Sequence, residues 1–285
     1  MRNLKVILSY DGTEFAGWQV QPGLETVQGI LASAIGRLSG ENVLPQGSGR
    51  TDAGVHALAQ VATFATASPM PVENWVVALN HILPPSIRVL EVREAAGDFH
   101  ARKSARAKTY RYRMYRGAIC PPFLARYVWH YPYPLDEQAM AAAASLVVGE
   151  LDFTSFAAVD RERAERMDPD PSERGAGAEQ FSTLRERREG WGSPTTSAAP
   201  TNALPANVRR IFSSAWIREE EEFVYSVRGS GFLHHMVRNL VGTFVLVGKG
   251  TLSRQDFERI LAARDRSQAG PTAPAAGLYL VGVEY

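Results

Sequence analysis

The sequence predicts an α+β protein made of two ferredoxin-like (RRM-like) halves, residues 1–105 and 106–285. In the first half, strand and helix patterns follow one another in the order strand, helix, strand, helix, strand, which is a ferredoxin-like arrangement. The second half again contains both strand and helix patterns. Between about 160 and 207, charge runs, Pro and Gly with few large apolar residues predict a disordered insertion.

The elements of the first half have recognisable ends. The apolar segment 4–10 predicts a strand. Thr26 is a suitable N-cap for a helix whose apolar residues recur at helical spacing as far as Leu38, and Gly40 is a suitable end. The remaining predicted elements of this half are a strand at 57–64, a helix at 73–80 and a strand at 87–92.

The second half is predicted in the same way. Asp136 is a suitable cap for a helix that runs to residue 148. Four glutamates at 219–222 predict an exposed acidic hairpin tip between two strands. The other predicted elements are strands at 109–115, 213–219, 222–228 and 278–285, a buried helix within 229–247 and a helix at 254–263.

Composition excludes several classes of protein. The 31 Lys and Arg residues nearly balance the 30 Asp and Glu residues, so any surface that binds nucleic acid must be a local patch. The single cysteine, Cys120, excludes an internal disulfide and a cysteine-based zinc site. No signal-peptide pattern and no apolar run of about 18 residues is present, so we expect a cytoplasmic protein that does not span a membrane.

The glycine-rich loop at 46–56 is the first candidate site. It carries Arg50 and Asp52 between glycines that allow sharp turns and close approach to a ligand. Phosphate-binding loops do not fit, because no Lys-Ser or Lys-Thr follows the last glycine and Asp52 occupies the place of a third fingerprint glycine. A simple turn in which Asp52 bonds its own backbone is the alternative.

Basic and aromatic residues are interleaved at 98–113, a composition typical of RNA-contacting surfaces. If 109–115 is a strand, Tyr110 and Tyr112 share one face while Arg111 points to the other. A half-buried strand with a solvated basic face is the alternative interpretation.

The apolar segment 229–247 contains one anomalous residue, Arg238. A buried guanidinium needs a carboxylate partner, and the equally unusual Asp52 is the candidate. His234 and His235 are adjacent, so on a helix they would not share a face as zinc ligands do. We interpret them as packing or hydrogen-bonding residues.

Four separated motifs together resemble the tRNA pseudouridine synthase A (TruA) family. They are Gly-Arg-Thr-Asp-Ala-Gly-Val-His at 49–56, Asp-Phe-His-Ala-Arg at 98–102 with Tyr-Arg-Tyr at 110–112, His-His-Met-Val-Arg-Asn at 234–239, and Pro-Ala-Ala-Gly-Leu-Tyr-Leu at 274–280. The resemblance covers nearly the whole chain outside 160–207. It implies isomerisation of uridine to pseudouridine in the anticodon stem-loop of tRNA, at positions 38 to 40, by a homodimer without cofactor or metal.

The resemblance also implies roles for single residues. Asp52 matches the nucleophile, Arg238 the cation that holds it ionised, and Tyr110 an active-site tyrosine that stacks on the target base or helps to remove the proton from C5. Arg50 would fill the space left by a flipped base or hold phosphate, and Arg102 and Arg111 would bind RNA. The antiparallel sheets of the two halves would meet around a central basic cleft with Asp52 at its floor.

A non-catalytic RNA-binding module on the same fold is the competing hypothesis. In that case Asp52 would be merely structural. Arg238 discriminates between the two, because a binding module has no use for a buried arginine directed at a loop carboxylate.

Overall fold

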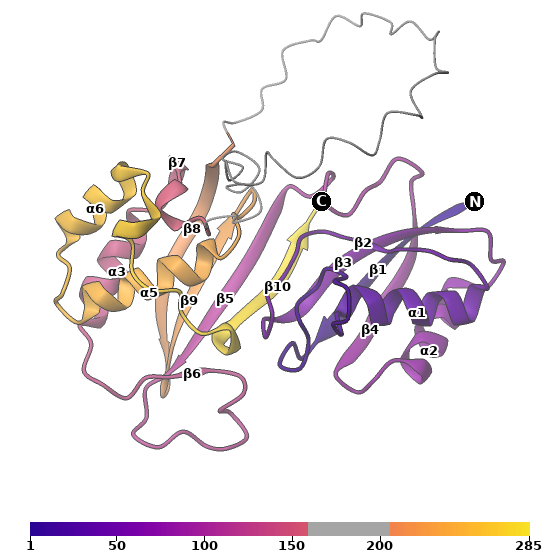
Figure 1. Ribbon diagram of the computed structural model, residues 1–285, viewed down its shortest axis with the longest axis horizontal. Helices are drawn as coiled ribbons and strands as arrows, with labels where there is room; N and C mark the ends of the chain where they lie inside the picture. Colours follow the sequence, from indigo (N-terminus) through magenta and orange to yellow (C-terminus); the bar gives the residue numbers. More distant parts are fainter. Residues whose placement is uncertain (159–205) are drawn as a thin grey trace, which may run out of the picture.

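The computed structural model describes residues 1–158 and 206–285 (Figure 1). The predicted insertion at about 160–207 lies almost entirely outside the described residues. The described parts form a mixed α+β structure, as predicted. None of the described helices is long and apolar enough to span a membrane.

The N-terminal half contains the predicted elements in the predicted order. The side chain of Thr26 accepts a hydrogen bond from Gly29 N at the start of the first helix, and Gly40 ends this helix in the left-handed conformation with φ 74°. A short strand before the third strand was not predicted. The elements are β1 (Arg2–Tyr10), α1 (Val27–Ser39), β2 (Gln46–Gly47), β3 (His56–Thr66), α2 (Val72–Ile82) and β4 (Ile87–Ala95).

The C-terminal half agrees less closely with the prediction. The buried helix begins only at Met236, because the chain leaves the preceding strand through an irregular segment and His235 adopts φ 59°. Asp136 caps its helix as expected, accepting from Ala139 N. The elements are β5 (Ala107–Tyr115), β6 (Trp129–His130), α3 (Glu137–Ser145), β7 (Gly149–Asp152), β8 (Val208–Glu219), β9 (Glu222–Gly229), α5 (Met236–Gly248), α6 (Arg254–Ala263) and β10 (Leu278–Glu284).

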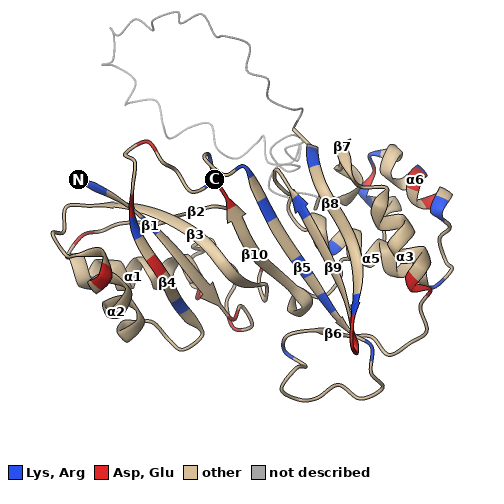
Figure 2. Cartoon of the chain, turned by 180° about the vertical axis from the view of Figure 1, so that it is seen from behind, with Lys and Arg blue, Asp and Glu red and all other residues tan. Residues whose placement is uncertain are grey.

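The strands of both halves belong to one mostly antiparallel sheet. Its order is β4-β1-β3-β10-β5-β9-β8-β7, with β2 and β6 paired at the side to β3 and β5. The last strand joins the halves, since β10 pairs in parallel with β3 and antiparallel with β5. The described helices lie on one face of this sheet (Figures 1 and 2).

The central strand β5 alternates as predicted. Tyr110 and Tyr112 are buried against the helix side, whereas Arg111 is exposed. Lys and Arg residues recur along β5, β8 and β9 (Figure 2). The predicted exposed acidic hairpin tip between β8 and β9 is confirmed, and its last residue, Glu222, also receives two hydrogen bonds from Arg113 on β5, at 2.7 and 2.5 Å.

Candidate active site

The glycine-rich loop at 46–56 is held against the N-terminal turn by close backbone contacts. A Cβ at Gly12 would lie 2.0 Å from the Val55 carbonyl oxygen, and one at Gly17 would lie 2.5 Å from the Thr51 carbonyl oxygen. Gly12 N also donates to His56 Nδ1, at 3.1 Å. Both glycines are therefore required by the approach of two backbones, which fixes the base of the loop.

A buried polar network supports the same loop from below. Gln60 Nε2 donates to the Gly49 carbonyl at 3.0 Å, and Gln60 Oε1 accepts from Ser48 Oγ at 2.6 Å. The hydroxyls of Tyr10 and Thr51 lie 2.9 Å apart. The sequence analysis missed Gln60, although a glutamine within an apolar strand signals a buried amide that must find partners.

Asp52 and Arg238 form the predicted ion pair. Arg238 Nη1 donates to Asp52 Oδ2 at 3.0 Å, and the two side chains are 15% and 16% exposed. Arg238 Nε donates to the carbonyl oxygen of Ala273 at 2.8 Å, which orients the guanidinium. The residue lies in the first turn of α5, and this helix brings it to the loop. The pairing expected from a buried arginine is confirmed.

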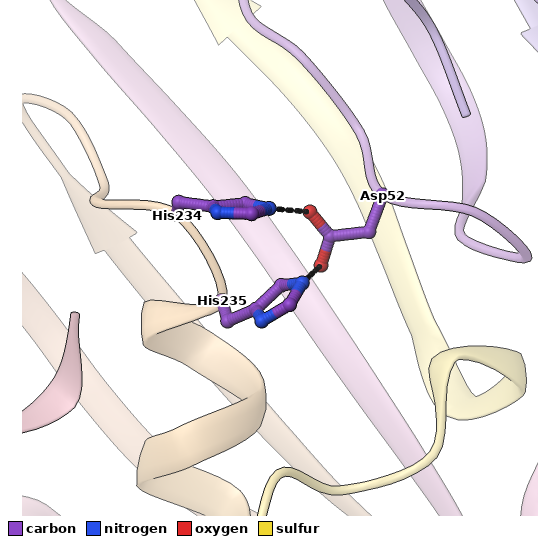
Figure 3. A group of neighbouring side chains, drawn as sticks. All are labelled: Asp52, His234 and His235. Atoms are coloured by element: carbon purple, nitrogen blue, oxygen red, sulfur yellow. Dashed lines mark ion pairs between the residues drawn. The ribbon is translucent and has the colours of Figure 1, made fainter. Parts of the chain in front are cut away.

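Two histidines also reach the Asp52 carboxylate (Figure 3). His234 Nε2 lies 3.4 Å from Oδ1 and His235 Nε2 lies 3.4 Å from Oδ2, while the two imidazoles are 3.9 Å apart. Their interpretation as packing or hydrogen-bonding residues is consistent with these contacts. The argument from helix-face spacing does not apply to them, because both residues precede α5.

The donor atoms of Asp52, His234 and His235 lie within 4.8 Å of one another, a spacing that a metal ion could occupy. The Arg238 guanidinium on Oδ2 opposes this use, since a second cation at the same oxygen would be repelled. The arrangement therefore suits an activated carboxylate better than a metal centre.

Tyr110, a residue of β5, lies near the Asp52 carboxylate. The side chain is 7% exposed, and its ring packs edge-on against Phe232 at 5.0 Å. Burial, followed by the nearby Tyr10 and Asp52, raises the pKa of Tyr110 far above its usual range. The phenol thus keeps its proton, and its hydroxyl can donate a hydrogen bond.

A basic cavity of about 550 Å³ opens beside the loop and contains two of the predicted RNA-binding residues, Arg50 and Arg102. Arg111 is not among its lining residues and lies exposed on β5 instead. Within residues 1–158 and 206–285, no carboxylate lies within ion-pair distance of Arg50 or Arg102. The cavity is lined by Trp18, Gln19, Gln28, Gln46, Gly47, Gly49, Arg50, His100, Arg102 and Lys103.

Lys108 connects this basic region to the loop. Its Nζ donates to the Ser48 carbonyl oxygen at 2.5 Å. Burial, and secondarily the charge of Arg102, lowers the pKa of Lys108 to about 8. A lysine held partly out of water beside Arg102, which has no carboxylate within ion-pair distance among the described residues, indicates a region suited to an anionic ligand.

Comparison with known proteins identifies the family. The pattern described as tRNA pseudouridine synthase matches residues 6–102 and 195–285. Over 285 residues the chain is 46% identical to a protein of Solibacter usitatus named tRNA pseudouridine synthase A, with all of both chains covered. Proteins of the same name from Moorella thermoacetica and Lacticaseibacillus casei are 42% and 39% identical, with 99% and 100% of each chain covered. This chain belongs to the tRNA pseudouridine synthase family.

Proposed function

We propose that this isomerase converts uridine to pseudouridine in the anticodon stem-loop of tRNA, at positions 38 to 40, with Asp52 as the nucleophile. One observation carries the assignment of Asp52: a partly buried carboxylate in a rigid loop lies 3.0 Å from the guanidinium of Arg238. The alternative, a non-catalytic RNA-binding module, would gain nothing from this pair. Membership of a synthase family also favours the enzyme.

The proposed chemistry uses the charge of Asp52. The guanidinium of Arg238 favours the ionised carboxylate and orients it. A carboxylate close to C1′ can attack there or stabilise an oxocarbenium-like centre, as in glycosidases. Attack at C6 of the base is the alternative route, and both routes need an ionised Asp52. No cofactor or metal takes part in this proposal.

The remaining residues of the proposal bind the substrate. Tyr110 stacks on the target base from the apolar side of the site, where its ring adjoins Phe232, and takes part in removal of the proton from C5. Arg50 and Arg102 hold phosphates from the basic cavity, and Arg50 fills the space left by the flipped nucleotide. Arg111 lies on the opposite face of β5 from Tyr110 and is a separate RNA contact in this proposal.

Four broader features belong to the same proposal. Each half has a ferredoxin-like plan, and the tRNA enters a basic cleft between the halves with Asp52 at its floor. The enzyme acts in the cytoplasm. It does so as a homodimer.

The decisive experiment is replacement of Asp52 by Asn or Ala. Tritium released from C5-labelled uridine in tRNA reports each turnover. We expect a rate at least roughly 10⁴-fold lower with tRNA binding retained, because removal of a covalent catalyst has effects of this size. Glu150→Gln, which changes an exposed carboxylate on β7, is the control and should be silent. A variant of Asp52 within about tenfold of wild type would refute the nucleophile assignment.

The substrate positions need a separate test. Transcripts of one tRNA in which uridine at 38, 39 or 40 is replaced singly by cytidine are incubated with the enzyme. Pseudouridine is then located by mass spectrometry of nuclease fragments. Loss of product at only the replaced position supports the proposal, whereas pseudouridine elsewhere in the tRNA would contradict the proposed specificity.

A further inference from the structure

The glycine-rich loop at 46–56 is held by side chains from two strands of the sheet. Gln60 on β3 donates from Nε2 to the carbonyl oxygen of Gly49 at 3.0 Å. Lys108 on β5 donates from Nζ to the carbonyl oxygen of Ser48 at 2.5 Å. In the sheet, β10 lies between β3 and β5. The bond from Gln60 therefore stays within the N-terminal half, whereas the bond from Lys108 joins the loop to the C-terminal half.

Lys108 lies on the strand that also carries Tyr110. Residues two apart on a strand point to the same face, so the two side chains share the face of β5 that is turned toward the loop. Asp52 follows Ser48 by four residues in that loop. β5 thus carries the tyrosine directly and holds the loop through Lys108, so that one strand sets the spacing between Tyr110 and Asp52.

Gly49 leaves open the space that the ammonium of Lys108 occupies. A Cβ at this position would lie 2.8 Å from Lys108 Nζ and 3.8 Å from Lys108 Cε. Apart from its chain neighbours, it would meet no other atom of the described residues within 4 Å. The φ of Gly49 is not in the left-handed region, so the backbone itself would accept an alanine. The glycine is therefore required by its contact with Lys108.

The ammonium of Lys108 is unfavourable for the folded protein. Burial holds it partly out of water and lowers its pKa to about 8, and the charge of Arg102 acts in the same direction. None of the ion pairs within residues 1–158 and 206–285 includes Lys108. Residues that lower stability are typical of sites where activity requires them.

We propose that Lys108 is a positioning residue that holds the glycine-rich loop, and with it Asp52, at the distance from Tyr110 that the reaction needs. The inference rests on the proposed place of Asp52 and Tyr110 at the reacting centre. Lys108 acts through the carbonyl of Ser48 and not on the substrate. A displacement of about 1 Å can lower a rate by about 10²-fold, so a hydrogen bond at a distance from the chemistry can control it.

The test replaces Lys108 by Met, a side chain of similar length that cannot donate a hydrogen bond. The rate of pseudouridine formation is measured in single turnovers at saturating enzyme, and tRNA affinity is measured by filter binding. We expect a rate about 10–100-fold lower. We expect tRNA affinity within about threefold of wild type and no fall in melting temperature, because the buried charge disappears together with its hydrogen bond. Lys249→Met, which removes an exposed lysine at the end of α5, is the control and should match wild type.

Gly49 provides a second and independent variant. Gly49→Ala should push the ammonium away from Ser48 and slow the reaction as Lys108→Ala does. In Lys108→Ala the space beside position 49 is empty, so the addition of Gly49→Ala should cause little further loss. Losses that multiply in the double variant would show that the ammonium does not act through this part of the loop and would overturn the proposal.

Chemical rescue separates the hydrogen bond from the charge. n-Propylammonium chloride can place an ammonium in the space left by Lys108→Ala and should raise the rate of this variant in proportion to its concentration. Tetramethylammonium chloride carries the same charge without an N–H donor and should have no such effect. Equal gains with both salts would count against a hydrogen bond to Ser48 and would overturn the positioning role.

The remaining outcomes are equally distinct. A rate of Lys108→Met at saturation within about threefold of wild type would refute the proposal. A loss confined to tRNA affinity would make Lys108 an RNA-binding residue and would refute it too. If Asp52→Asn is inactive while Lys108→Met reacts as wild type, only the positioning role is lost. If Asp52→Asn keeps its activity, the nucleophile assignment is lost.

Discussion

Replacement of Arg238 by Met tests the pair on which the site depends. Arg238 Nη1 lies 3.0 Å from Asp52 Oδ2. At an effective dielectric constant of about 20, the Coulomb attraction between the two charges is about 5–6 kcal/mol, before the cost of desolvation is subtracted. Desolvation offsets much of this attraction. His234 and His235 also contact the Asp52 carboxylate, which further reduces the free-energy cost of removing the arginine. We therefore expect a coupling free energy of about 1–3 kcal/mol between positions 52 and 238.

The coupling is measured by a double-mutant cycle. Urea unfolding at pH 7 gives the free energy of unfolding of wild type, Asp52→Asn, Arg238→Met and the double variant. Arg238→Met also removes the hydrogen bond to the carbonyl of Ala273, but this loss is common to both backgrounds and cancels. In Asp52→Asn the arginine has already lost its ionic partner, so the second change should destabilise less.

Activity gives an independent measure of the same pair. Without the guanidinium, the Asp52 carboxylate loses the donor that orients it, so the activity of Arg238→Met should fall. Arg238→Lys should restore only part of the rate, because an ammonium group lacks the planar donor geometry of guanidinium. Arg254→Met, which breaks an exposed i,i+4 pair with Glu258, is the control and should change stability by less than about 1 kcal/mol. A coupling below about 0.5 kcal/mol would refute the reasoning.

Further predictions concern the residues around the pair. Tyr110→Phe should retain most of its tritium-release activity if the ring only contacts the base, and near-complete inactivity would show that the hydroxyl is needed. The pKa of Lys108 is about 8 in the folded protein and 10.5 in the unfolded chain. Below pH 8 the folded protein must hold the buried lysine in its unfavourable charged form. The free energy of unfolding should therefore rise between pH 8 and 10.5. Lys108→Met should remove that rise in urea titrations; an unchanged profile would contradict the burial argument. Arg102→Glu combined with Arg111→Glu should weaken tRNA binding and flatten its dependence on salt concentration, and an unchanged slope would place the RNA elsewhere. Gln60→Leu should lower the catalytic rate and the melting temperature together, since it leaves the Gly49 carbonyl and Ser48 hydroxyl without their buried partner.

Local elements were predictable because their signals are local. Thr26 and Gly40 mark the ends of α1 by the chemistry of capping, and the structure confirms both. The Asp52–Arg238 pair was predictable for a different reason. A buried guanidinium has few possible partners, so the requirement for charge compensation identified the carboxylate across 186 positions of sequence.

The features that the sequence analysis missed depend on long-range geometry. The start of α5 was placed too early because residues 229–247 read as one segment, whereas His235 adopts φ 59° and the helix begins only at Met236. The contact of both histidines with Asp52 depends on that conformation. The union of the strands into one sheet depends on β10, whose seven residues give no local sign of their two partners.

The central position of β10 has a consequence for biosynthesis. Ribosomes deliver the N-terminal half first, so the edges of β3 and β5 that β10 will cover remain unpaired until residues 278–284 have emerged. Unpaired strand edges are templates for association with other chains. The nascent polypeptide thus carries both edges from the synthesis of β5 until β10 emerges, and Asp52 is synthesised before its partner Arg238. The sheet therefore closes only when β10 joins it, and chains that have not yet paired β10 expose strand edges at which other chains can associate.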